Sequence, residues 1–358
     1  MNKINLGIIF GGKSAEHEIS LRSAASMLNA VNREKYNIHL IGISRDGKWY
    51  LKKDISSPTP LLAQNQTEII LKKESEGSSL IDANGKKDLL SLDVVFPIMH
   101  GSYGEDGTIQ GFLKAVDLPF VGVDLMASAV GMDKDMSKRI WRDAGIPIAR
   151  YHCIRRAERQ NVDSQLICKD LGLPVFVKPA NAGSSVGVKK VNSEKDLLAA
   201  IDHALLYDHK VLIEEAIIGI EIECAILGNE YPRASVLGEI IPQSEFYSYE
   251  AKYLDDHGAV MHIPAEIQAE TVHQIQAAAI LAFKSIGAEG LSRVDFFLKP
   301  DGSYVINEIN TMPGFTEISM YPKLWEHTGI SYSNLIDQLI TLALERHQRD
   351  KNLKTSFD

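Results

Sequence analysis

The residue types best suited to chemistry lie close together in the stretch RVDFFLKPDGSYVINEINTMPG, residues 293–314. Its Pro-Asp-Gly tripeptide is a typical turn sequence, so the stretch predicts two antiparallel strands joined by a tight loop. Counting inward from a loop of two or four residues places Asp295 opposite Glu308 and Arg293 opposite Asn310. Facing side chains of such a pair lie roughly 4.5–5.5 Å apart at Cβ, so these four groups are expected to meet.

Two carboxylates at that separation repel each other unless a proton or a cation lies between them. Asp295, Glu308 and Asn310 supply hard oxygen donors, which are the ligands that Mg²⁺ prefers. Arg293 adds a fixed positive charge, which is useful where negative charge develops during a reaction. The alternative is a solvated polar face on an edge hairpin. A packed hairpin that lines a cleft is favoured by the apolar residues of the other face: Val294, Phe296, Leu298, Val305 and Ile309.

Composition narrows the class of protein. The chain has 358 residues, of which 45% are hydrophobic and 24% charged, so two or three domains of ordinary globular composition are expected. A net charge of −9 argues against non-specific attraction to nucleic acid. The three cysteines have no metal-ligand spacing and are odd in number, which fits a reducing cytosol. Because no apolar run approaches a membrane span and the N-terminus lacks a signal-peptide pattern, a cytoplasmic protein is predicted.

The N-terminal residues predict an α/β domain. A buried strand is expected over 4–10, a helix over about 14–31 and a second strand over 35–43. This order is typical of an open parallel sheet. A further buried strand over 91–98 leads into His100 and a glycine-rich loop, at the strand end where ligands bind in such sheets. A loop histidine with a purely structural role is the alternative.

The run GIIFGGKS over 7–14 satisfies the pattern G-x-x-x-x-G-K-[ST] of nucleotide-binding phosphate loops. In such a loop the variable residues bend around phosphate, whereas here Ile8, Ile9 and Phe10 belong to the predicted apolar strand. We therefore predict no phosphate loop at this position. A nucleotide-dependent switch that uses Lys13 is the rival hypothesis of a different class, together with a nucleotide sensor whose catalytic site has decayed.

The middle of the chain predicts phosphate binding by a different kind of loop. A strand over 173–178 ends in a lysine and is followed by PANAGSSVG, a small and flexible segment rich in N–H and O–H donors. A returning strand is expected over 186–191. A helix predicted over 130–144 precedes this unit and carries Lys134. The alternatives are an ordinary hairpin loop and a solvated surface lysine.

Two further segments suit a nucleotide pocket. Glu214 ends one predicted strand and Glu221 begins the next, so their carboxylates edge an apolar segment suited to a base and a ribose. The segment over 246–264 is long, polar and aromatic with little periodicity, which is typical of a functional lid or of a disordered stretch. Its four aromatic residues and Lys252 favour a lid that closes over a ligand. Amphipathic helices are expected over 268–286 and 332–346.

Several motifs occur together along the chain, in the order GGKSAEHEIS, HGSYGEDGTIQG, MDKDMSK, VKPANAGSSVGV, YEAKYL, RVDFFL and NEINTMPGFTEISMYP. Together they resemble the D-alanine–D-alanine ligases, which are ATP-grasp enzymes of peptidoglycan precursor synthesis. The resemblance extends from about residue 4 to residue 345. It implies a fold of the α/β and α+β classes. The expected units are an N-terminal Rossmann-like open-sheet domain over 1–122, a central ATP-grasp lobe over 123–212, and a C-terminal lobe with lid and metal site over 213–358.

The resemblance also implies roles for individual residues. The family's positions that contact the nucleotide and its phosphates correspond here to Lys134, Lys178, Ser185, Glu214, Glu221 and Lys252. Ligands of two Mg²⁺ ions, for which Mn²⁺ is the alternative, match Asp295, Glu308 and Asn310. An oxyanion-stabilising pair matches Arg293 and the N–H of Gly314. The first D-alanine matches Glu16 and His100, the carboxylate of the second matches Ser319 and Met320, and a hydrogen-bonded triad matches Glu16, Ser184 and Tyr253. One departure is that Ala216 and Ile217 are smaller than an aromatic residue found there in some members, which predicts a looser adenine pocket.

The implied activity is ATP-dependent ligation of two D-alanines. ATP phosphorylates the carboxylate of the first D-alanine, and the amine of the second attacks the resulting acyl phosphate, which leaves ADP and phosphate as further products. The alternative is a depsipeptide ligase that joins D-alanine to D-lactate. Tyr253 in YEAKYL matches the form of the lid associated with dipeptide synthesis. Family members are commonly dimers, so a homodimer is expected, with no nucleic-acid or membrane partner.

Overall fold

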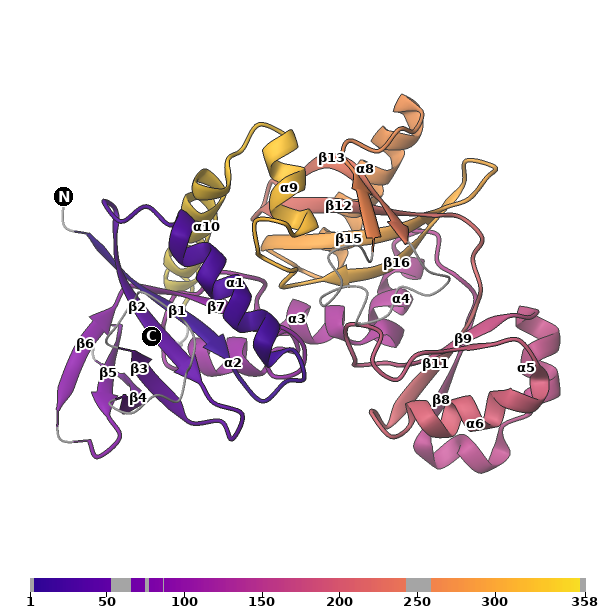
Figure 1. The fold of residues 1–358 in the computed structure, drawn as a ribbon, viewed down its shortest axis with the longest axis horizontal. Helices are drawn as coiled ribbons and strands as arrows, with labels where there is room; N and C mark the ends of the chain where they lie inside the picture. The colour runs from indigo at the N-terminus through magenta and orange to yellow at the C-terminus, as the bar shows by residue number, and fades with distance from the viewer. Residues whose placement is uncertain (1–2, 53–65, 75–76, 86, 243–258, 355–358) are drawn as a thin grey trace.

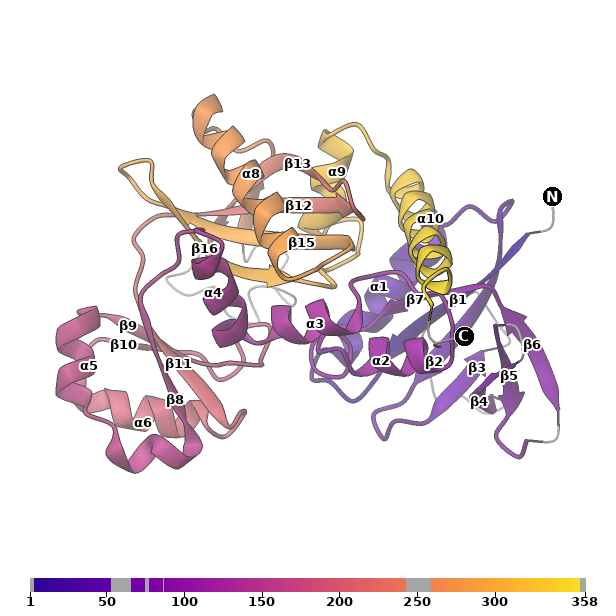
Figure 2. The ribbon, with the colours of Figure 1, turned by 180° about the vertical axis from the view of Figure 1, so that it is seen from behind.

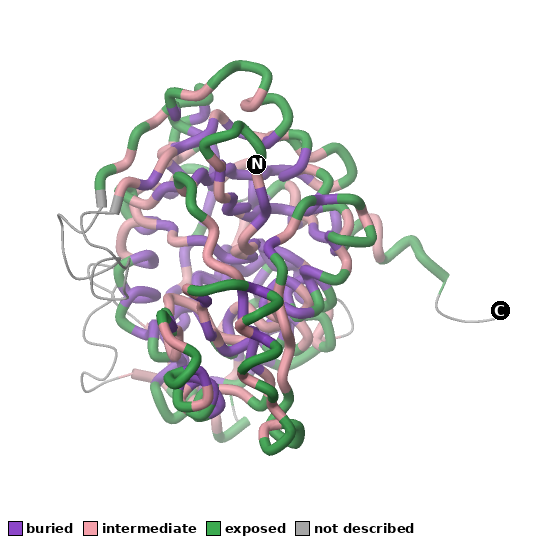
Figure 3. Tube along the Cα trace, turned by 90° about the vertical axis from the view of Figure 1, so that its right-hand side faces the viewer, coloured by how far each residue is buried: buried purple, intermediate pink, exposed green. Residues whose placement is uncertain are grey.

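The strands of this chain form three sheets, which follow one another along the sequence (Figure 1). The computed structural model describes residues 3–52, 66–74, 77–85, 87–242 and 259–354. Within these ranges no helix combines the length and the apolar character that crossing a bilayer requires. Figure 3 shows that buried residues gather in the interior of the molecule, while exposed residues follow its outer segments.

The first sheet has seven strands in the order β6-β5-β4-β3-β2-β1-β7. They are β1 (Ile4–Gly11), β2 (Tyr36–Ile43), β3 (Trp49–Lys52), β4 (Thr67–Lys73), β5 (Ser78–Asp82), β6 (Asp88–Leu92) and β7 (Val94–Ile98). The parallel pairing of β1 with β2 through α1 (His17–Ala30) confirms the predicted strand-helix-strand start. The buried strand predicted over 91–98 is confirmed as β7 from Val94 onward, whereas residues 91–92 belong to β6. The chain divides at Asp93, whose carboxylate accepts a 2.7 Å hydrogen bond from the Asn5 N–H.

Alternation along β1 places helices on both faces of this sheet. Leu6 and Ile8 point into a core formed with α1 and with α10 (Tyr332–Lys351), the last helix of the chain. Ile9 points to the opposite face, where α2 (Thr108–Ala115) packs. Because successive side chains of a strand point to opposite faces, a continuous apolar run is what a sheet covered on both faces requires.

The second sheet has four strands in the order β10-β9-β11-β8. They are β8 (Tyr151–Arg155), β9 (Val175–Pro179), β10 (Lys189–Val191) and β11 (Lys210–Glu215). One face is covered by α5 (Ser164–Leu171) and α6 (Glu194–Ala204), and a short 3-10 helix, η1 (Arg156–Asn161), follows β8. The other face carries Lys178 and Glu214 toward the rest of the molecule. The domain boundary predicted between residues 212 and 213 falls inside β11.

The third sheet has five strands in the order β14-β13-β12-β15-β16. They are β12 (Ile220–Gly228), β13 (Arg233–Pro242), β14 (Ala259–His262), β15 (Gly290–Leu298) and β16 (Tyr304–Asn310). Figure 2 shows α8 (Ala269–Ser285) lying across one face of this sheet, and its apolar side chains join the core there. On the other face, α9 (Met320–His327) contributes to the core that also contains α1 and α10.

Two helices occupy the region where the sequence predicts one over 130–144. They are α3 (Leu125–Met132) and α4 (Lys134–Asp143), and the single-helix prediction is wrong because the backbone leaves the helical conformation at Asp133. The Asp133 carboxylate caps α4 by accepting hydrogen bonds from the N–H groups of Asp135 and Met136, both at 3.1 Å.

The hairpin of β15 and β16 confirms the two predicted pairs, with Asp295 opposite Glu308 and Arg293 opposite Asn310. The loop itself differs from the prediction. It has three residues, because the Lys299 N–H bonds to the Ser303 carbonyl at 2.8 Å. Gly302 adopts a φ of 83°, as a three-residue hairpin loop with a left-handed last residue requires.

A three-residue loop shifts the pairing near the turn by one position, and a β-bulge at Asn307 shifts it back. The bulge also changes which side chains face the core. Ile306 and Ile309, three positions apart, both join the core beneath α8, so Ile306 takes the place predicted for Val305. Glu308 and Asn310 therefore face the opposite side, as predicted, although the loop length used to predict this was wrong.

Candidate active site

Two adjoining pockets lie where the three units meet. The first is bordered by loops of the first sheet, by the hairpin of β15 and β16, and by residues 311–314 that follow it. The second lies between the second and third sheets. The two pockets share a wall made of Lys134, Ala182, Gly183, Ser184 and Glu308. A group bound in either pocket therefore lies beside the same five residues.

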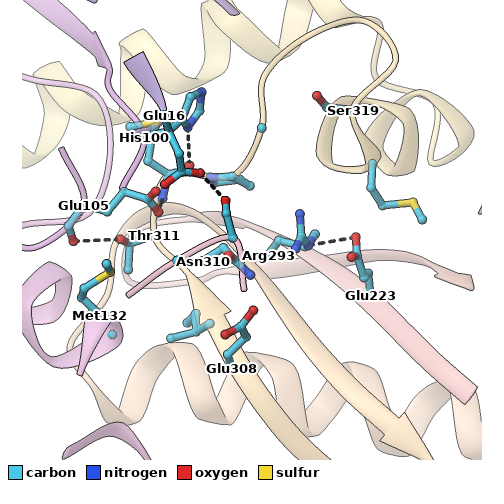
Figure 4. Close-up of a pocket in the computed structure, with 18 of the residues that line it drawn as sticks. Glu16, His100, Glu105, Met132, Glu223, Arg293, Glu308, Asn310, Thr311 and Ser319 are labelled. Carbon is cyan, nitrogen blue, oxygen red and sulfur yellow. Dashed lines mark hydrogen bonds and ion pairs between the residues drawn. The ribbon is translucent and has the colours of Figure 1, made fainter. Parts of the chain in front are cut away.

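The hairpin places Arg293, Glu308 and Asn310 in the first pocket (Figure 4). The Arg293 guanidinium donates to Asp295 through Nε at 2.8 Å and Nη2 at 2.7 Å. Asp295 is 1% exposed and also accepts a 2.9 Å hydrogen bond from the Asn310 amide. On the neighbouring strand β12, Glu223 lies opposite Asp295, with its Oε2 2.8 Å from Arg293 Nε. Two buried carboxylates thus hold one guanidinium in a fixed orientation.

Several carboxylate oxygens suited to binding a metal ion lie near the Arg293 guanidinium. Carboxylate oxygens of Glu221, Glu223 and Asp295 lie within 4.8 Å of one another. Glu308, opposite Asp295 on β16, has a carboxylate oxygen 3.4 Å from Lys134 Nζ. Carboxylate and amide oxygens fit a hard divalent cation such as Mg²⁺ and do not fit a soft metal. The predicted ligands Asp295, Glu308 and Asn310 are therefore brought together with two further acids.

The second pocket contains a buried group of opposite charges. Glu214 is buried, with its Oε1 3.0 Å from Lys138 Nζ, and it forms an ion pair with Lys178. Burial by itself raises the pKa of Glu214, but Lys138 and Lys178 outweigh it and hold this pKa below its ordinary value. Burial lowers the pKa of Lys138, whose ammonium group is fully enclosed. Glu214 thus serves as the charge partner of two lysines at the pocket wall.

The described residues predicted to contact nucleotide all line this second pocket: Lys134, Lys178, Ser185, Glu214 and Glu221. Phe176, Ile217 and Phe297 add apolar surface from three different strands or loops. Ser184 and Ser185 lie in the loop between β9 and β10, which arches over the pocket. This combination of apolar surface, lysines and hydroxyl groups suits a base at one end and phosphates at the other.

Glu16 and His100 reach the first pocket from the first sheet (Figure 4). The Ser184 hydroxyl donates to Glu16 Oε1, so the loop over the second pocket is bonded directly to the first unit. His100 Nδ1 lies 3.1 Å from the Met312 carbonyl and Nε2 lies 2.9 Å from the Ser23 hydroxyl. Because a carbonyl only accepts, we assign the imidazole proton to Nδ1. Burial lowers the pKa of His100 despite the nearby charge of Glu16, which favours this neutral form.

Gly314, Ser319 and Met320, which are predicted to contact the oxyanion and the second D-alanine, line the same pocket. Lys252 and Tyr253, and most of the predicted lid over 246–264, lie outside the described residues. Residues 7–10 of the phosphate-loop-like run form part of β1, which agrees with the prediction that they make no phosphate loop.

Two acids of the site were not predicted. Glu105 follows β7 in the glycine-rich loop and accepts hydrogen bonds from the N–H groups of Gly101 at 2.7 Å and Met312 at 3.3 Å. Burial, followed by the charge of Glu16, raises the pKa of Glu105 to about 8. The second acid is Glu223. It lies two residues after Glu221 on β12, so strand alternation alone could have placed both on one face.

Comparisons with known proteins support a common origin over the whole chain. Family models described as "D-ala D-ala ligase N-terminus" and "D-ala D-ala ligase C-terminus" match residues 5–123 and 140–341. The chain is 50% identical to the D-alanine--D-alanine ligase of Oceanobacillus iheyensis over 361 residues, which cover 99% of each chain. It is 48% identical to D-alanine--D-alanine ligase A of Escherichia coli K12 over 366 residues, which cover 100% of each.

Solved structures give the same result. The D-alanine-D-alanine ligase from Coxiella burnetii superimposes with a TM-score of 0.86 at 36% identity, covering 98% of this chain and 97% of that one. The VanG D-Ala:D-Ser ligase from Enterococcus faecalis also gives a TM-score of 0.86 at 36% identity, covering 96% of this chain and 100% of that one.

Proposed function

The chain belongs to the D-alanine–D-alanine ligase family, and from this premise we propose how its two pockets divide the reaction. The protein is an ATP-grasp enzyme that joins two D-alanines for peptidoglycan precursor synthesis. The observation that supports this division of the reaction is that the two pockets share a wall. A phosphoryl group beside Lys134 and Glu308 reaches a carboxylate in the first pocket without crossing solvent.

We infer that the second pocket holds ATP. Lys134 and Lys178 offset the negative charge of the phosphates, and the hydroxyl and backbone N–H groups around Ser185 cover them. Phe297 presents an apolar surface to the base, and Glu221 is placed to accept hydrogen bonds from the ribose hydroxyls. Phosphoryl transfer needs positioning and charge stabilisation rather than a protein nucleophile, and these residues supply both.

A divalent metal fits the oxygen-rich side of the shared wall. The donor set that we propose for two Mg²⁺ ions, or Mn²⁺ in their place, is Asp295, Glu308 and Asn310. When bound, such ions neutralise phosphate charge and hold the transferred group in line. The two carboxylates face each other across β15 and β16, and an added positive charge relieves their repulsion.

The two amino acids are proposed to lie in the first pocket, on either side of Arg293. Glu16 is placed to pair with the ammonium group of the first D-alanine, and the neutral His100 lies beside it. The carboxylate of the second D-alanine is assigned to Ser319 and Met320 at the opposite side. Its amine then attacks the acyl phosphate. Arg293, together with the Gly314 N–H, stabilises the oxyanion that forms, and Glu223 and Asp295 keep the guanidinium in place.

The test is to incubate the protein with Mg²⁺-ATP and D-alanine, to measure ADP release, and to identify the product by mass. Parallel reactions contain L-alanine, D-alanine with D-lactate, or D-alanine with D-serine. ADP together with D-alanyl-D-alanine from D-alanine alone is the expected result. ADP only when D-lactate or D-serine is added would change the second substrate. No ADP in any mixture would overturn the assignment.

Tyr253 is the residue on which the choice between D-alanine and D-lactate is proposed to depend. The YEAKYL sequence around it matches the lid form associated with dipeptide synthesis. Replacement of Tyr253 by Phe is expected to raise the yield of D-alanyl-D-lactate relative to D-alanyl-D-alanine in mixed-substrate reactions. An unchanged product ratio would count against this role.

Assembly and location are also proposals. A homodimer is expected because family members are commonly dimers, and sedimentation equilibrium at several protein concentrations measures this directly. A cytoplasmic location is expected because ATP and the precursors of cell-wall peptides are found there, and fractionation of cells that produce the protein tests it. Neither a membrane nor a nucleic acid is expected as a partner.

A further inference from the structure

The turn after α6 and the first residue of β11, together residues 207–210, contact two elements that border the second pocket. No residue of this turn was predicted to take part in the site. The turn touches the beginning and the end of the loop over residues 181–188 and the first turn of α4. The loop and α4 in turn carry Ser185 and Lys134, two of the proposed phosphate contacts.

Asp208 holds the beginning of the loop. Its Oδ2 accepts hydrogen bonds from the backbone N–H of Asn181 at 2.8 Å and from the Asn181 side-chain amide at 3.0 Å. Its Oδ1 accepts from the N–H of His209 at 2.6 Å, which fixes the carboxylate within its own turn. Hydrogen bonds to an ionised carboxylate are roughly twice as strong as those between neutral groups. Asp208 therefore restrains Asn181 through both its backbone and its side chain.

Lys210 holds the first turn of α4. Its ammonium group lies 2.7 and 2.6 Å from the two carboxylate oxygens of Asp133, which caps α4, and 3.3 Å from Asp135. Its carbonyl accepts a 2.9 Å hydrogen bond from the Ala180 N–H, next to the loop. Lys134 completes this link, because its N–H donates to the Ala180 carbonyl at 3.0 Å.

Tyr207 covers the end of the loop. A Cβ atom built on Gly187 would lie 2.7 Å from the Tyr207 ring and 2.8 Å from Pro179, so only glycine fits between them. The ring is supported by His203, with centroids 5.5 Å apart. Gly187 itself has a φ of 74°, which glycine adopts without strain.

The segment between these two ends is strained. Ser184 has a φ of 50° and Ser185 a φ of 59°, a conformation that costs an L-residue roughly 1–2 kcal/mol. Two consecutive residues of this kind persist only where surrounding contacts hold them. Ser184 is bonded to Glu16, and the fixed ends at Asn181 and Gly187 supply the rest of the restraint.

We propose that Asp208 is a positioning residue for nucleotide binding, which holds the loop over 181–188 in its phosphate-covering form before ATP arrives. The inference rests on the proposed placement of ATP in the second pocket. A restrained loop loses less conformational entropy when ATP binds, so the contact between Asp208 and Asn181 is expected to increase the affinity for ATP. In this proposal Asp208 contacts neither the nucleotide nor the amino acids, and it acts on ATP binding through Asn181.

The test compares Asp208→Ala, Asp208→Asn and a matched control, Asp202→Ala. Asp202 lies on α6, close to Asp208 in sequence, and its carboxylate pairs with Arg159 away from the loop. Steady-state kinetics give KM for ATP and for D-alanine, and calorimetry with a non-hydrolysable ATP analogue and Mg²⁺ gives Kd without turnover. Thermal unfolding of each variant reports whether it remains folded.

Asp208→Ala is expected to raise both KM for ATP and Kd for the analogue about tenfold, with kcat and KM for D-alanine within about twofold of wild type. Asp208→Asn retains an acceptor oxygen and is expected to recover most of the loss, and Asp202→Ala should leave all four quantities unchanged. In a double-mutant cycle, Asn181→Ala should add little to Asp208→Ala, because the Asn181 side-chain amide has already lost its acceptor in Asp208→Ala.

Unchanged ATP affinity in a folded Asp208→Ala protein would overturn the proposal. Parallel losses in ATP affinity, D-alanine affinity and unfolding temperature would also overturn it, since they indicate a general structural role. The calorimetric Kd for the analogue distinguishes a failure of this proposal from a failure of the proposed function. If wild-type protein releases no ADP but binds the analogue, the ligase assignment fails while the role of Asp208 is still measured.

Discussion

Glu308 occupies the junction of the two pockets, with a side chain that faces Asp295 across the hairpin and Lys134 across the shared wall. Replacement by Gln keeps the shape of the side chain but removes the charge that a hard divalent cation requires. We expect Glu308→Gln to lower kcat by at least about a hundredfold, or about 2.7 kcal/mol of transition-state stabilisation, and to shift the Mg²⁺ titration to higher concentration. Glu326→Gln, on the exposed side of α9, is the control. Full activity of Glu308→Gln would exclude Glu308 as a metal ligand.

Glu105 provides a pH-dependent test of the site. Its pKa is raised from 4.5 in the unfolded chain to about 8 when folded, so between these values the folded protein binds a proton that the unfolded chain lacks. The stability that the folded protein gains from this bound proton is fully present below about pH 4.5 and is lost as pH rises through about 8. A Gln at this position is always neutral. We therefore expect the stability of Glu105→Gln relative to wild type to increase from pH 5 to pH 8, by up to about 1.4 kcal/mol per pH unit.

Urea unfolding of both proteins at pH 5, 7 and 9 measures this difference. Glu326→Gln serves again as the exposed control and is expected to show no such trend. A stability difference that stays constant over this range would mean that Glu105 is ionised in the folded protein.

At the level of single residues, the sequence predicts best which side chains meet where a turn sequence fixes their spacing. Arg293, Asp295, Glu308 and Asn310 were identified because a turn sequence fixes which positions face each other. Glu223 was missed because its role is defined by Arg293, a residue of another strand about seventy positions away. No local pattern contains such a contact.

At the level of elements, the hairpin shows how a correct pairing can follow from an incorrect loop. The predicted two- or four-residue loop gives the same pairing as the observed three-residue loop followed by a bulge at Asn307. Two shifts of one residue in opposite directions cancel. The bulge could not be predicted, because its effect is to place Ile306 in the core beneath α8, and this depends on packing between distant elements.

The division between α3 and α4 has a similar origin. The sequence GMDKDMSK contains no proline, and its residues are compatible with a continuous helix. The backbone turns at Asp133 because the Asp133 side chain caps α4 and binds Lys210 from the second sheet. The spacing of apolar residues along a helix does not reveal a break that is stabilised by an ion pair with a residue distant in sequence.

The loop between β9 and β10 yields a prediction at the same level. Gly187→Ala introduces both a strained φ and a steric conflict with Tyr207 and Pro179. Gly302→Ala introduces a similar φ but meets no atom within 4 Å, so it is the matched control. Gly302→Ala should lose about 1–2 kcal/mol of stability and Gly187→Ala should lose more than this, both measured by urea unfolding. Only Gly187→Ala should raise KM for ATP, by roughly tenfold, or about 1.4 kcal/mol. Equal KM values in the two variants would show that the conflict at Gly187 does not reach the nucleotide pocket.

At the level of the whole molecule, the last helix returns to the first sheet. The α10 residues Leu335, Ile336 and Leu339 share one core with Leu6 and Ile8 of β1. Figures 1 and 2 both show α10 beside the first unit, although almost the whole chain separates them in sequence. The sequence indicated the amphipathic character of this helix. Its partner could not be inferred, because many faces of the molecule offer apolar surface of the same kind.

Arg346 fixes α10 in this position. It is buried, its guanidinium donates to the carbonyls of Gly122 at 2.6 Å and Phe120 at 2.8 Å, and it lies 4.7 Å from the centre of the Phe120 ring. Lysine cannot make both hydrogen bonds in this planar arrangement. We expect Arg346→Lys to lower the free energy of unfolding by roughly 2–4 kcal/mol, with little change in kcat at low temperature.

Arg349→Lys is the matched control for this substitution. Arg349 lies on the same helix but is 40% exposed, and it pairs with Glu289 at the surface. Exposed ion pairs contribute about 1 kcal/mol or less. Equal losses of stability in the two variants would mean that the buried hydrogen bonds of Arg346 do not hold α10 in place.

The shared wall of Lys134, Ala182, Gly183, Ser184 and Glu308 has a consequence for inhibitor design. A purine-like fragment for one pocket and an amino-acid fragment for the other need only a short tether across this wall. Once one half is bound, the second half experiences an effective concentration in the millimolar range or higher, so two weak fragments combine into a strong ligand. A bacterium that escapes such a compound by altering the wall would also alter the place where we propose that phosphate is transferred.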